Sequence, residues 1–501
     1  MMPDMHAHSS GAVRLRQLLP EASADVAITG ITLDSRDVHP GWLYAALPGQ
    51  RTHGARFVSQ AVTSGAAAVL TDADGATIAG EIDVPLVVVD NARRALGDAA
   101  AAFYGHPTKH LTSFGVTGTN GKTTTVALIA QALQSLGSSV GTIGTLGARL
   151  DGAALEAHST TVTTPESTDL QQQLATMRER GANAVAMEVS SHALALERVQ
   201  GMHFDVVGFT NLGQDHLDYH HTLEEYFAAK RKLFEPGRAD AAVIWTDDER
   251  GAELAEIVRQ QGAMRLTTVG TRDADWMLSD VAPHGRLGTR GTVHRDGRAL
   301  SVELALPGMH NMVDAVLALA MLDAAGFDAE RAVEGLRQAQ VPGRMQRAIL
   351  DDAAPLVVVD FAHTPQAVEA AVEELAQLGP LTTVMGCGGD RDPVKRPLIG
   401  AAAARHSKKV VVTDDNPRTE DPAAIRAATL KGAHGHGAEV VEMAGRADAI
   451  CYALAHVERN GVVAILGKGH EQGQILADRV IDFDDVRVAR DAWAKMQEER
   501  R

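Results

Sequence analysis

Residues 115–125 read GVTGTNGKTTT and hold the residue types of a phosphate-binding loop. Gly118 and Gly121 let the backbone come close to an anion. Lys122 offers a point charge to the outer phosphates, and Thr123 offers a hydroxyl to Mg²⁺. The usual pattern places four residues between its first Gly and the Gly-Lys pair, a spacing that this loop does not keep. Because an apolar segment precedes the loop and a helical pattern follows it, we favour a nucleotide site over a Gly-rich turn with a surface lysine.

Two later segments place polar side chains directly after apolar runs. MEVSSHAL contains Glu188 and Ser190, and NLGQDH contains Asp215 and His216. A carboxylate at the end of a strand suits Mg²⁺, a hard cation that prefers oxygen ligands. On the residues alone, Glu188 also fits a solvated loop acid, and His216 a hydrogen-bonded structural histidine.

The segment LEEYFAAKRKLF predicts an amphipathic helix with a lysine on its apolar face. Spacings of three and four residues put Lys230 on the side of the apolar residues, whereas Arg231 and Lys232 fall elsewhere. An isolated buried ammonium is costly, so Lys230 must reach solvent, find a partner or change its chemistry. The apolar residues of this face are Leu223, Tyr226, Phe227, Leu233 and Phe234.

A second group of chemically suggestive residues lies near the carboxyl end of the chain. An arginine after a strand can pair bidentately with a carboxylate, and a carboxylate can meet an ammonium. This region supplies both kinds of partner for an amino-acid head group, although a Pro-containing turn with solvated charges fits DNPR alone. The segments are GCGGDRD with Arg391, DNPR with Asp415, Asn416, Pro417 and Arg418, and GKGHE with Gly467 and Glu471.

The elements that must position these residues alternate between strand-like and helical patterns. We expect an α/β chain of three domains: a small N-terminal α/β domain (1–105), a central P-loop ATPase-like domain with a parallel sheet (106–341) and a C-terminal Rossmann-like α/β domain (342–501). Residues 292–306 alternate around Asp296-Gly297, which predicts a hairpin. In open α/β sheets, ligands bind at the carboxyl ends of strands, so the loops described above are expected to form site walls.

Composition limits the class of protein further. The 501 residues are 45% apolar and 22% charged, as in ordinary globular proteins, and the net charge of −17 argues against nucleic-acid or anionic-membrane binding. Cys387 and Cys451 are too few for a disulfide framework. With no signal-peptide pattern and no membrane-spanning run, we expect a cytoplasmic protein without membrane insertion.

The TGTNGKTT loop after an apolar strand resembles that of the Mur ligases and the related folylpolyglutamate synthetases. These three-domain enzymes join an amino acid to a carboxylate at the expense of ATP. The resemblance runs from Leu33 to about Arg490. It implies a metal site for two Mg²⁺ ions, with Lys230 carbamylated by CO₂ and Lys122, Glu188, His216 and Lys230 as catalytic residues. The implied metal ligands are Thr123, Glu188, His216 and Lys230, and the implied ATP contacts are Thr117, Gly118, Thr119, Asn120, Gly121, Lys122, Thr123, Asn311, Arg344 and His363.

The resemblance also implies a nucleotide-sugar peptide as the carboxylate substrate. LDSRDVHPG looks like the uridine-binding segment, and TTPES looks like the loop that grips the muramoyl peptide. Three positions depart from the family pattern, namely Val162, Leu196 and Asp314, the last standing where the family commonly has Asn. The implied contacts are Leu33, Ser35, Thr163, Thr164, Ser190 and Arg198.

DNPR is the motif of those family members that add diaminopimelate, and lysine-adding members usually lack its Arg. It therefore implies meso-diaminopimelate as the amino acid, bound by Arg391, Asp415, Asn416, Pro417, Arg418, Gly467 and Glu471. The implied function is ATP-dependent amide formation through an acyl phosphate in peptidoglycan precursor synthesis, by a monomer with small-molecule substrates. The alternatives are a lysine-adding or folate-polyglutamylating relative, and a P-loop ATPase without ligase activity.

Overall fold

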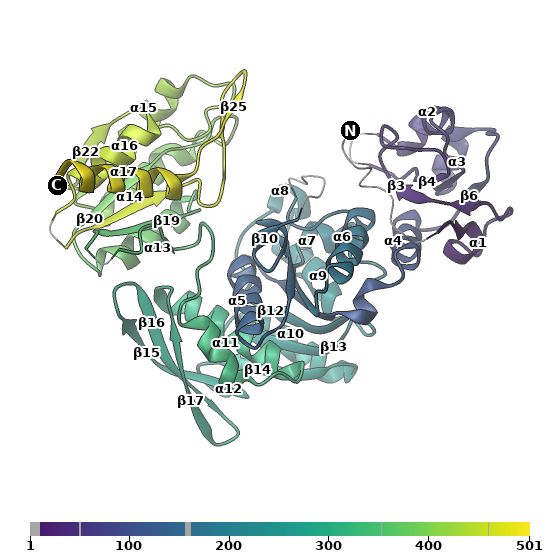
Figure 1. Ribbon diagram of the computed structural model, residues 1–501, viewed down its shortest axis with the longest axis horizontal. Coiled ribbons are helices and arrows are strands. Elements are labelled where there is room, and N and C mark those ends of the chain that lie inside the picture. The colour runs from purple at the N-terminus through teal and green to yellow at the C-terminus, as the bar shows by residue number, and fades with distance from the viewer. Residues whose placement is uncertain (1–10, 50–51, 156–161, 352, 459, 501) are drawn as a thin grey trace. The chain divides into compact units, whose positions relative to one another are not determined.

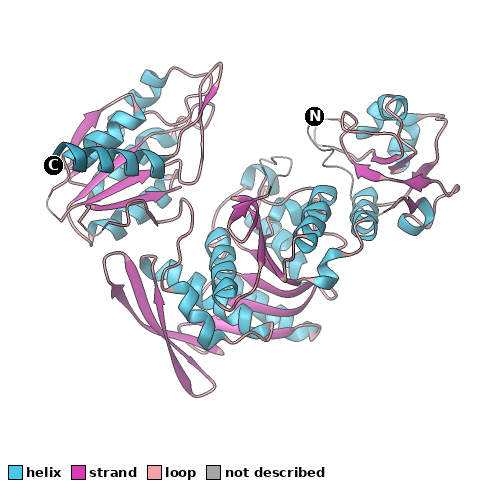
Figure 2. Cartoon of the chain, viewed as in Figure 1, coloured by secondary structure: helices cyan, strands magenta, loops and turns pink. Residues whose placement is uncertain are grey.

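The computed structural model describes residues 11–49, 52–155, 162–351, 353–458 and 460–500 (Figure 1). The chain divides into two units. The first comprises Met1–Leu278, His294–Arg298 and Asp314–Gly335, and the second Ser279–Val293, Ala299–Val313 and Leu336–Arg501. Helices and strands alternate along most of the chain, as Figure 2 shows.

The N-terminal part of the first unit contains a four-stranded parallel sheet. Its order is β3-β4-β5-β6, with Leu43, Val69 and Leu70 fully buried in it. The helix α4 begins after Asn91, whose side chain accepts a hydrogen bond from the Arg94 amide and so caps the helix. The elements are β1 (Val13–Arg14), α1 (Leu15–Leu18), β2 (Ala27–Ile28), β3 (Gly30–Thr32), β4 (Trp42–Ala45), η1 (Gly54–Phe57), α2 (Val58–Thr63), β5 (Ala68–Thr71), α3 (Ala73–Ala79), β6 (Leu86–Val88), α4 (Ala92–Phe103) and η2 (Pro107–His110).

The central sheet of the first unit holds the phosphate-loop segment. Its strand order is β10-β9-β8-β11-β7-β12-β13-β14, parallel from β8 to β14. The strands are β7 (Thr112–Thr117), β8 (Val140–Gly144), β9 (Gly147–Leu150), β10 (Ala153–Ala154), β11 (Ala184–Glu188), β12 (Phe204–Phe209), β13 (Ala239–Trp245) and β14 (Arg265–Gly270). The helices are α5 (Lys122–Ser135), α6 (Ser167–Glu179), α7 (Ser191–Ala195), α8 (Leu217–His220), α9 (Leu223–Arg231), η3 (Lys232–Phe234), α10 (Glu249–Gln261) and α12 (Ala329–Ala332), followed by η4 (Val333–Leu336).

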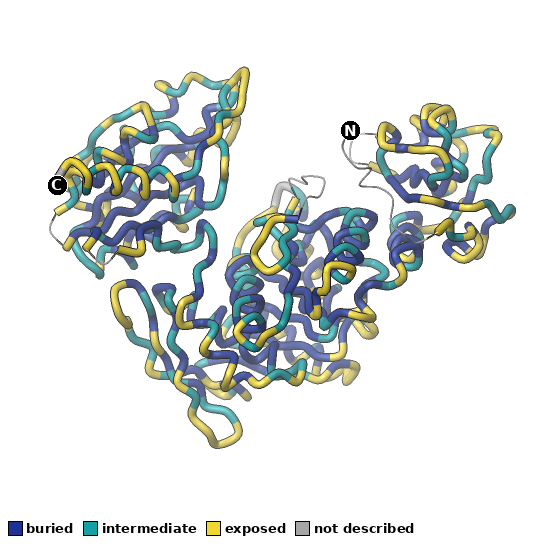
Figure 3. The backbone as a smooth tube through the Cα atoms, in the orientation of Figure 1, coloured by how far each residue is buried: buried dark blue, intermediate teal, exposed yellow. Residues whose placement is uncertain are grey.

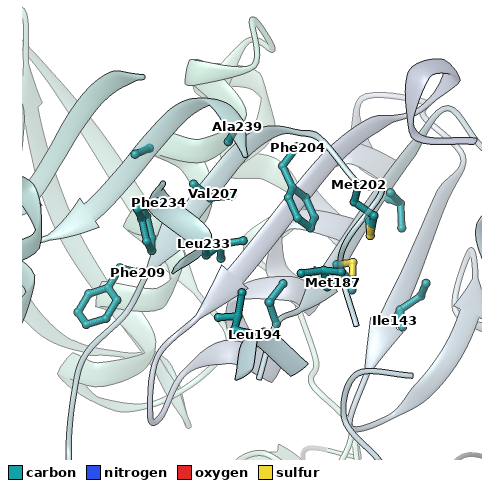
Figure 4. Packing of buried hydrophobic residues seen from close by; sticks show 14 of the residues in the cluster. Ile143, Met187, Leu194, Met202, Phe204, Val207, Phe209, Leu233, Phe234 and Ala239 are labelled. Carbon is teal, nitrogen blue, oxygen red and sulfur yellow. The ribbon is translucent and has the colours of Figure 1, made fainter. Parts of the chain in front are cut away.

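Apolar side chains from these strands form a continuous core. Phe204, Phe209 and Phe234 belong to one buried cluster together with Met187 and Leu233 (Figure 4). Strands that are buried on both faces have nearly uninterrupted apolar sequences, and this is why they could be predicted from the sequence. In Figure 3 the central sheet is coloured mainly dark blue, the colour of buried residues.

The sheet order continues from β14 through β15 (Trp276–His284), β16 (Gly288–Arg295) and β17 (Arg298–Leu304), and α11 (Gly308–Ala324) follows. Asp296 and Gly297 separate β16 from β17 and have φ values of 48° and 72°. This left-handed backbone is the conformation that a tight hairpin turn demands, so the predicted hairpin is present.

The second unit contains a six-stranded sheet of order β18-β19-β23-β20-β21-β22, in which only β18 is antiparallel. Alternate residues feed two cores: Val358 and Val410 lie in one cluster, and Val357 and Val411 in another. The elements are β18 (Gln346–Arg347), β19 (Leu356–Asp360), α13 (Pro365–Ala376), β20 (Leu381–Met385), α14 (Lys395–His406), β21 (Lys409–Val412), α15 (Pro422–Ala433), β22 (Glu439–Glu442), α16 (Arg446–Ala455), β23 (Val462–Leu466), β24 (Gln474–Ile475), β25 (Val480–Ile481) and α17 (Asp485–Arg500). Among the described helices, none is long and apolar enough to span a bilayer.

Candidate active site

The phosphate-loop segment joins the end of β7 to the start of α5. Gly118 and Gly121 have φ values of 152° and 86°, a region that favours glycine. A β-carbon on Gly118 would overlap the Thr210 hydroxyl, and one on Gly121 would overlap the Asp314 carboxylate. Both glycines are therefore required by conformation and by space in the loop that leads into the N-terminus of α5, where helix geometry favours an anion.

Side chains from the end of β12 hold this loop. The Asn120 amide donates to Asn211 Oδ1 at 3.0 Å, and the Thr210 hydroxyl donates to the Asn120 carbonyl at 2.6 Å. The Lys122 ammonium folds back and donates to the carbonyls of Gly118 and Thr119, each at 2.8 Å. Sequence reasoning missed Thr210 and Asn211, although their place directly after an apolar run was the same signal that marked His216.

Glu188 lies at the end of β11, buried beside the start of α5. Its Oε1 accepts from the Thr123 hydroxyl at 3.0 Å and from the Thr145 amide at 2.8 Å, and its Oε2 accepts from the Thr145 hydroxyl at 3.1 Å. The hydroxyl and carboxylate oxygens of Thr123 and Glu188 are the hard donors that Mg²⁺ prefers, and the pair fits this ion. Within the described residues, no group of three or more His, Cys, Asp or Glu side chains is arranged to hold a metal ion.

Lys230 is buried on α9, as its place on the apolar face predicts, with 1% of its surface exposed. Its Nζ donates to the Gly118 carbonyl at 2.7 Å and lies 4.4 Å from the ring centroid of Tyr226. Burial, and secondarily the charge of Lys122, lower the pKa of Lys230 well below its ordinary value. The structure thus brings Lys230 to the same loop as Lys122, a juxtaposition that favours a neutral amine.

His216 stands at the border of this region and is more exposed. Its side chain lies 3.5 Å from Asp215, and its ring centroid lies 4.8 Å from that of His192 and 6.1 Å from that of Tyr226. Its φ of 53° places it in the left-handed region. The Tyr226 ring therefore lies near both His216 and Lys230.

The predicted peptide-binding residues surround the carboxyl end of β11. The Thr164 hydroxyl donates to the Glu188 carbonyl at 2.9 Å and accepts from the Ser190 amide at 3.0 Å. Arg198 donates to the Thr164 carbonyl at 3.0 Å and pairs with Glu166 at 2.9 Å. The Thr163 and Thr145 hydroxyls are 3.4 Å apart. These groups lie together, and Arg198 stabilises the loop that contains Thr164 and Glu166.

The remaining predicted nucleotide residues lie elsewhere. In the N-terminal part, the buried Ser35 hydroxyl lies 3.4 Å from Gln60 Oε1, and Leu33 packs against the apolar core. In the second unit, Asn311 donates to the Pro307 carbonyl at 2.6 Å, the Arg344 guanidinium lies 4.8 Å from the Phe361 ring centroid, and His363 Nδ1 lies 2.8 Å from the Phe361 carbonyl.

Asp314, where the family commonly has Asn, is buried against Gly121. Burial raises the pKa of Asp314 well above its ordinary value, and the Thr125 hydroxyl and the charge of Lys122 only partly offset this. An acid whose pKa is higher in the folded than in the unfolded chain makes stability fall as pH rises through the interval between the two values. The carboxylate form is thus the one that the fold disfavours.

We expect Asp314→Asn to raise Tm by about 2 °C or more near pH 8, since the neutral amide removes this ionisation. The gain should shrink as pH falls and vanish below about 4, the unfolded-chain value, because the carboxyl is then protonated in both states. Thermal melts across this range measure it, with Asp296→Asn, an exposed turn carboxylate, as the matched control. A gain that does not change with pH would contradict the assigned protonation.

The carboxyl-terminal cluster lies where β20, β21 and β23 end. Arg418, with a φ of 52°, donates to the Gly389 carbonyl at 2.7 Å. A β-carbon on Gly388 would lie 3.0 Å from Arg418 Nη1 and 3.7 Å from Arg391 Cγ, so the two arginines flank the same glycine. Burial raises the pKa of Asp415. Two guanidinium groups and acidic side chains are thereby collected on one set of loops.

Within this cluster Asn416 donates to Glu471 Oε2 at 2.8 Å. A β-carbon on Gly467 would lie 3.0 Å from Asp415 Oδ2, so this glycine admits the buried carboxylate. Sequence reasoning missed Lys468, whose Nζ lies within 3.4 Å of three of these side chains. The strand and loop order places the predicted residues of GKGHE beside DNPR.

Comparison with known proteins defines the class. Residues 27–104 match the model of the Mur ligase family catalytic domain, residues 116–322 that of the Mur ligase middle domain, and residues 343–469 that of the Mur ligase glutamate ligase domain. The chain therefore belongs to the Mur ligase family, and the predicted three-domain α/β fold class is confirmed.

Individual relatives narrow the likeness. The chain is 45% identical over 487 residues to the UDP-N-acetylmuramoyl-L-alanyl-D-glutamate--2,6-diaminopimelate ligase of Streptomyces coelicolor, covering 95% of this chain and 94% of the relative. It is 42% identical to the enzyme of the same name from Pseudomonas aeruginosa, covering 96% and 98%. A solved structure of a ligase with this name aligns with a TM-score of 0.72 at 31% identity, covering 97% of this chain and 99% of that one. A Mycobacterium tuberculosis folylpolyglutamate synthase, at 19% identity and a TM-score of 0.59, shares the fold.

Proposed function

We propose that this protein is an ATP-dependent ligase that adds meso-2,6-diaminopimelate to the D-glutamate of UDP-N-acetylmuramoyl-L-alanyl-D-glutamate. The observation that carries the proposal is the cluster in which Arg391 and Arg418 flank Gly388 beside Asp415 and Glu471. Such a set meets the carboxylate and the ammonium of an amino-acid head group. The full-length relatives that carry this activity in their names support the same substrate.

The reaction proceeds in two steps. The γ-phosphoryl group of ATP moves to the D-glutamyl carboxylate and gives an acyl phosphate and ADP. The neutral amine of diaminopimelate then attacks the acyl carbon, and the tetrahedral intermediate expels phosphate and leaves an amide. Catalysis of this kind depends on positioning and on neutralising charge. The phosphate loop and Lys122 would hold the phosphates at the N-terminus of α5.

Thr123 and Glu188 would hold Mg²⁺, which when bound offsets negative charge on the phosphates. His216 and a carbamylated Lys230 would complete the metal environment, with two ions in all. The buried Lys230 amine supports carbamylation, because a lowered pKa favours the neutral form that adds to CO₂ to give a carbamate and a proton. The carbamate would also remove the cost of a buried ammonium.

The remaining contacts carry over as proposals. Asn311, Arg344 and His363 are proposed to contact ATP. Thr163, Thr164, Ser190 and Arg198 are proposed to place the muramoyl peptide, and Leu33 and Ser35 the uridine. We also propose domain boundaries after residues 105 and 341 and, from the reaction class, cytoplasmic action as a monomer in peptidoglycan precursor synthesis.

The proposal is tested by phosphate release from ATP with the UDP-muramoyl dipeptide and a panel of amino acids. We expect release to require the dipeptide and to be fastest with meso-diaminopimelate. Preference for L-lysine, or for a folate acceptor with glutamate, would assign the chain to another amide-forming branch. Release that is independent of any carboxylate acceptor would indicate an ATPase without ligase activity.

A further inference from the structure

Lys468 lies in the loop after β23, and its side chain is 0% exposed. Its Nζ lies 3.0 Å from Asn416 Oδ1, 3.2 Å from Glu471 Oε2 and 3.4 Å from Asp415 Oδ1. An ammonium has three N–H donors, and three acceptor oxygens from two loops receive them. A buried ammonium is stable only when it is paired and hydrogen-bonded in this way.

The Asn416 side chain is used within the same network. Its Oδ1 also accepts from the Ile475 amide at 2.9 Å, and its Nδ2 donates to Glu471 Oε2 at 2.8 Å. The Gln474 side chain donates to the Asp415 carbonyl at 2.6 Å. Asn416 is 4% exposed, so its carboxamide orients Glu471 from inside the protein.

Glu471 is the member of the network that opens outward. Its side chain is 37% exposed, whereas that of Lys468 is fully buried and that of Asp415 is 10% exposed. The hydrogen bonds from Lys468 and Asn416 both end on Glu471 Oε2. Oε2 of Glu471 is therefore held by two buried side chains, while the carboxylate as a whole remains accessible to a ligand.

Another buried cation, Arg446, makes no hydrogen bond to Glu471 among the described residues, because its guanidinium is held by Asp485. Arg446 is paired through Nε and Nη2 with the two oxygens of Asp485, each at 2.7 Å, and both side chains are 0% exposed. The charge of Arg446 still acts on Asp415 at longer range, but the cation that makes direct hydrogen bonds to the carboxyl groups of Asp415 and Glu471 is Lys468. Of the two carboxyl groups, Glu471 is the one that an incoming ammonium can reach from solvent.

We propose that Lys468 is a positioning residue that fixes Glu471 and Asn416 so that the site accepts the distal ammonium of a diamino acid. This inference rests on the proposed ligase function. Lys468 acts through Glu471 and does not itself touch the substrate. A merely structural ion cluster would affect folding alone, whereas a positioning residue affects the use of one substrate more than the others.

The test compares Lys468→Met and Lys468→Arg with Lys408→Met. Lys408 is exposed, lies directly before β21 in the same unit and pairs with Glu458. We expect Lys468→Met to raise KM for meso-diaminopimelate at least about tenfold, as for a lost charge-assisted hydrogen bond, and to leave KM for ATP and for the dipeptide within about twofold. The KM of Lys468→Arg for meso-diaminopimelate should lie between those of the wild type and Lys468→Met, because arginine keeps the charge but cannot reproduce the three hydrogen bonds of the ammonium. Lys408→Met should resemble the wild type.

A double variant separates positioning from folding, and it uses Lys468→Arg so that the buried charge is kept. In a Glu471→Gln background, Lys468→Arg should add little to the rise in KM, since both changes act on the same contact. Independent, multiplicative rises would overturn the inference, as would an unchanged KM for diaminopimelate in a folded Lys468 variant. If the wild type shows no turnover that depends on a diamino acid, the proposed function itself fails, a result distinct from either.

Discussion

Replacing Lys230 with alanine is expected to lower kcat by about 10²- to 10³-fold, the loss typical of removing one preorganised charge-stabilising group. The side chain is buried, lies 2.7 Å from the Gly118 carbonyl and shares the phosphate loop with Lys122. A carbamate on this amine would supply an anionic oxygen on the same loop as the Lys122 ammonium. Steady-state phosphate release with saturating substrates measures the loss.

Short carboxylates should restore part of this activity, because formate or acetate can enter the space that the alanine leaves and supply the missing oxygen. Lys232→Ala, two positions further along and off the apolar face, is the matched control and should keep wild-type rates without added carboxylate. Carbon-13 NMR of protein equilibrated with labelled bicarbonate should show a carbamate signal that Lys230→Ala lacks. Full activity of Lys230→Ala without carboxylate would refute the carbamate.

Replacing Arg418 with lysine is expected to lower kcat/KM for meso-diaminopimelate by about 10- to 100-fold, which corresponds to losing one or two charge-assisted hydrogen bonds. Arg418 is held by the Gly389 carbonyl beside Arg391, a position from which a planar guanidinium can meet a carboxylate with two parallel N–H groups. A lysine keeps the charge and loses that geometry. Kinetics with varied amino acid at saturating ATP and dipeptide measure the effect.

Arg405→Lys provides the comparison for this experiment. Arg405 is an exposed arginine of the same unit that pairs with Glu369, and its replacement should leave kcat/KM for diaminopimelate within about twofold, as for surface pairs in general. If Arg418→Lys behaves in the same way, the assignment of the amino-acid substrate to this cluster is wrong.

Much of the fold and part of the candidate site could be predicted from local patterns in the sequence. The apolar runs marked the strands of both main sheets, and the three- and four-residue spacing on α9 placed Lys230 inward, where the structure has it. The two loop glycines were predicted from the phosphate-loop pattern, and the structure adds that their left-handed backbone disfavours any other residue. Each of these features depends on neighbours in sequence or on a known turn requirement.

Contacts between distant segments were beyond such patterns. The Lys230–Gly118 hydrogen bond joins residues 112 positions apart, and the Asn416–Glu471 bond joins residues 55 positions apart. The sequence named Asn416 as a ligand contact by resemblance but gave no sign of the hydrogen bonds that its carboxamide makes with Lys468, Glu471 and Ile475. Lys468 escaped notice because a lysine between two glycines in a loop reads as solvated, and only the tertiary structure buries it against two carboxyl groups.

The most direct test of the proposed chemistry follows the fate of the carboxylate oxygen. The wild-type protein is incubated with ATP, meso-diaminopimelate and a UDP-muramoyl dipeptide that carries oxygen-18 in the reacting D-glutamyl carboxylate. Mass spectrometry should then show the diaminopimelate amide and one labelled oxygen in each released phosphate, because the acyl phosphate breaks at the carbonyl carbon. Unlabelled phosphate, or phosphate formed without the amide, would contradict phosphoryl transfer to the carboxylate and with it the ligase function.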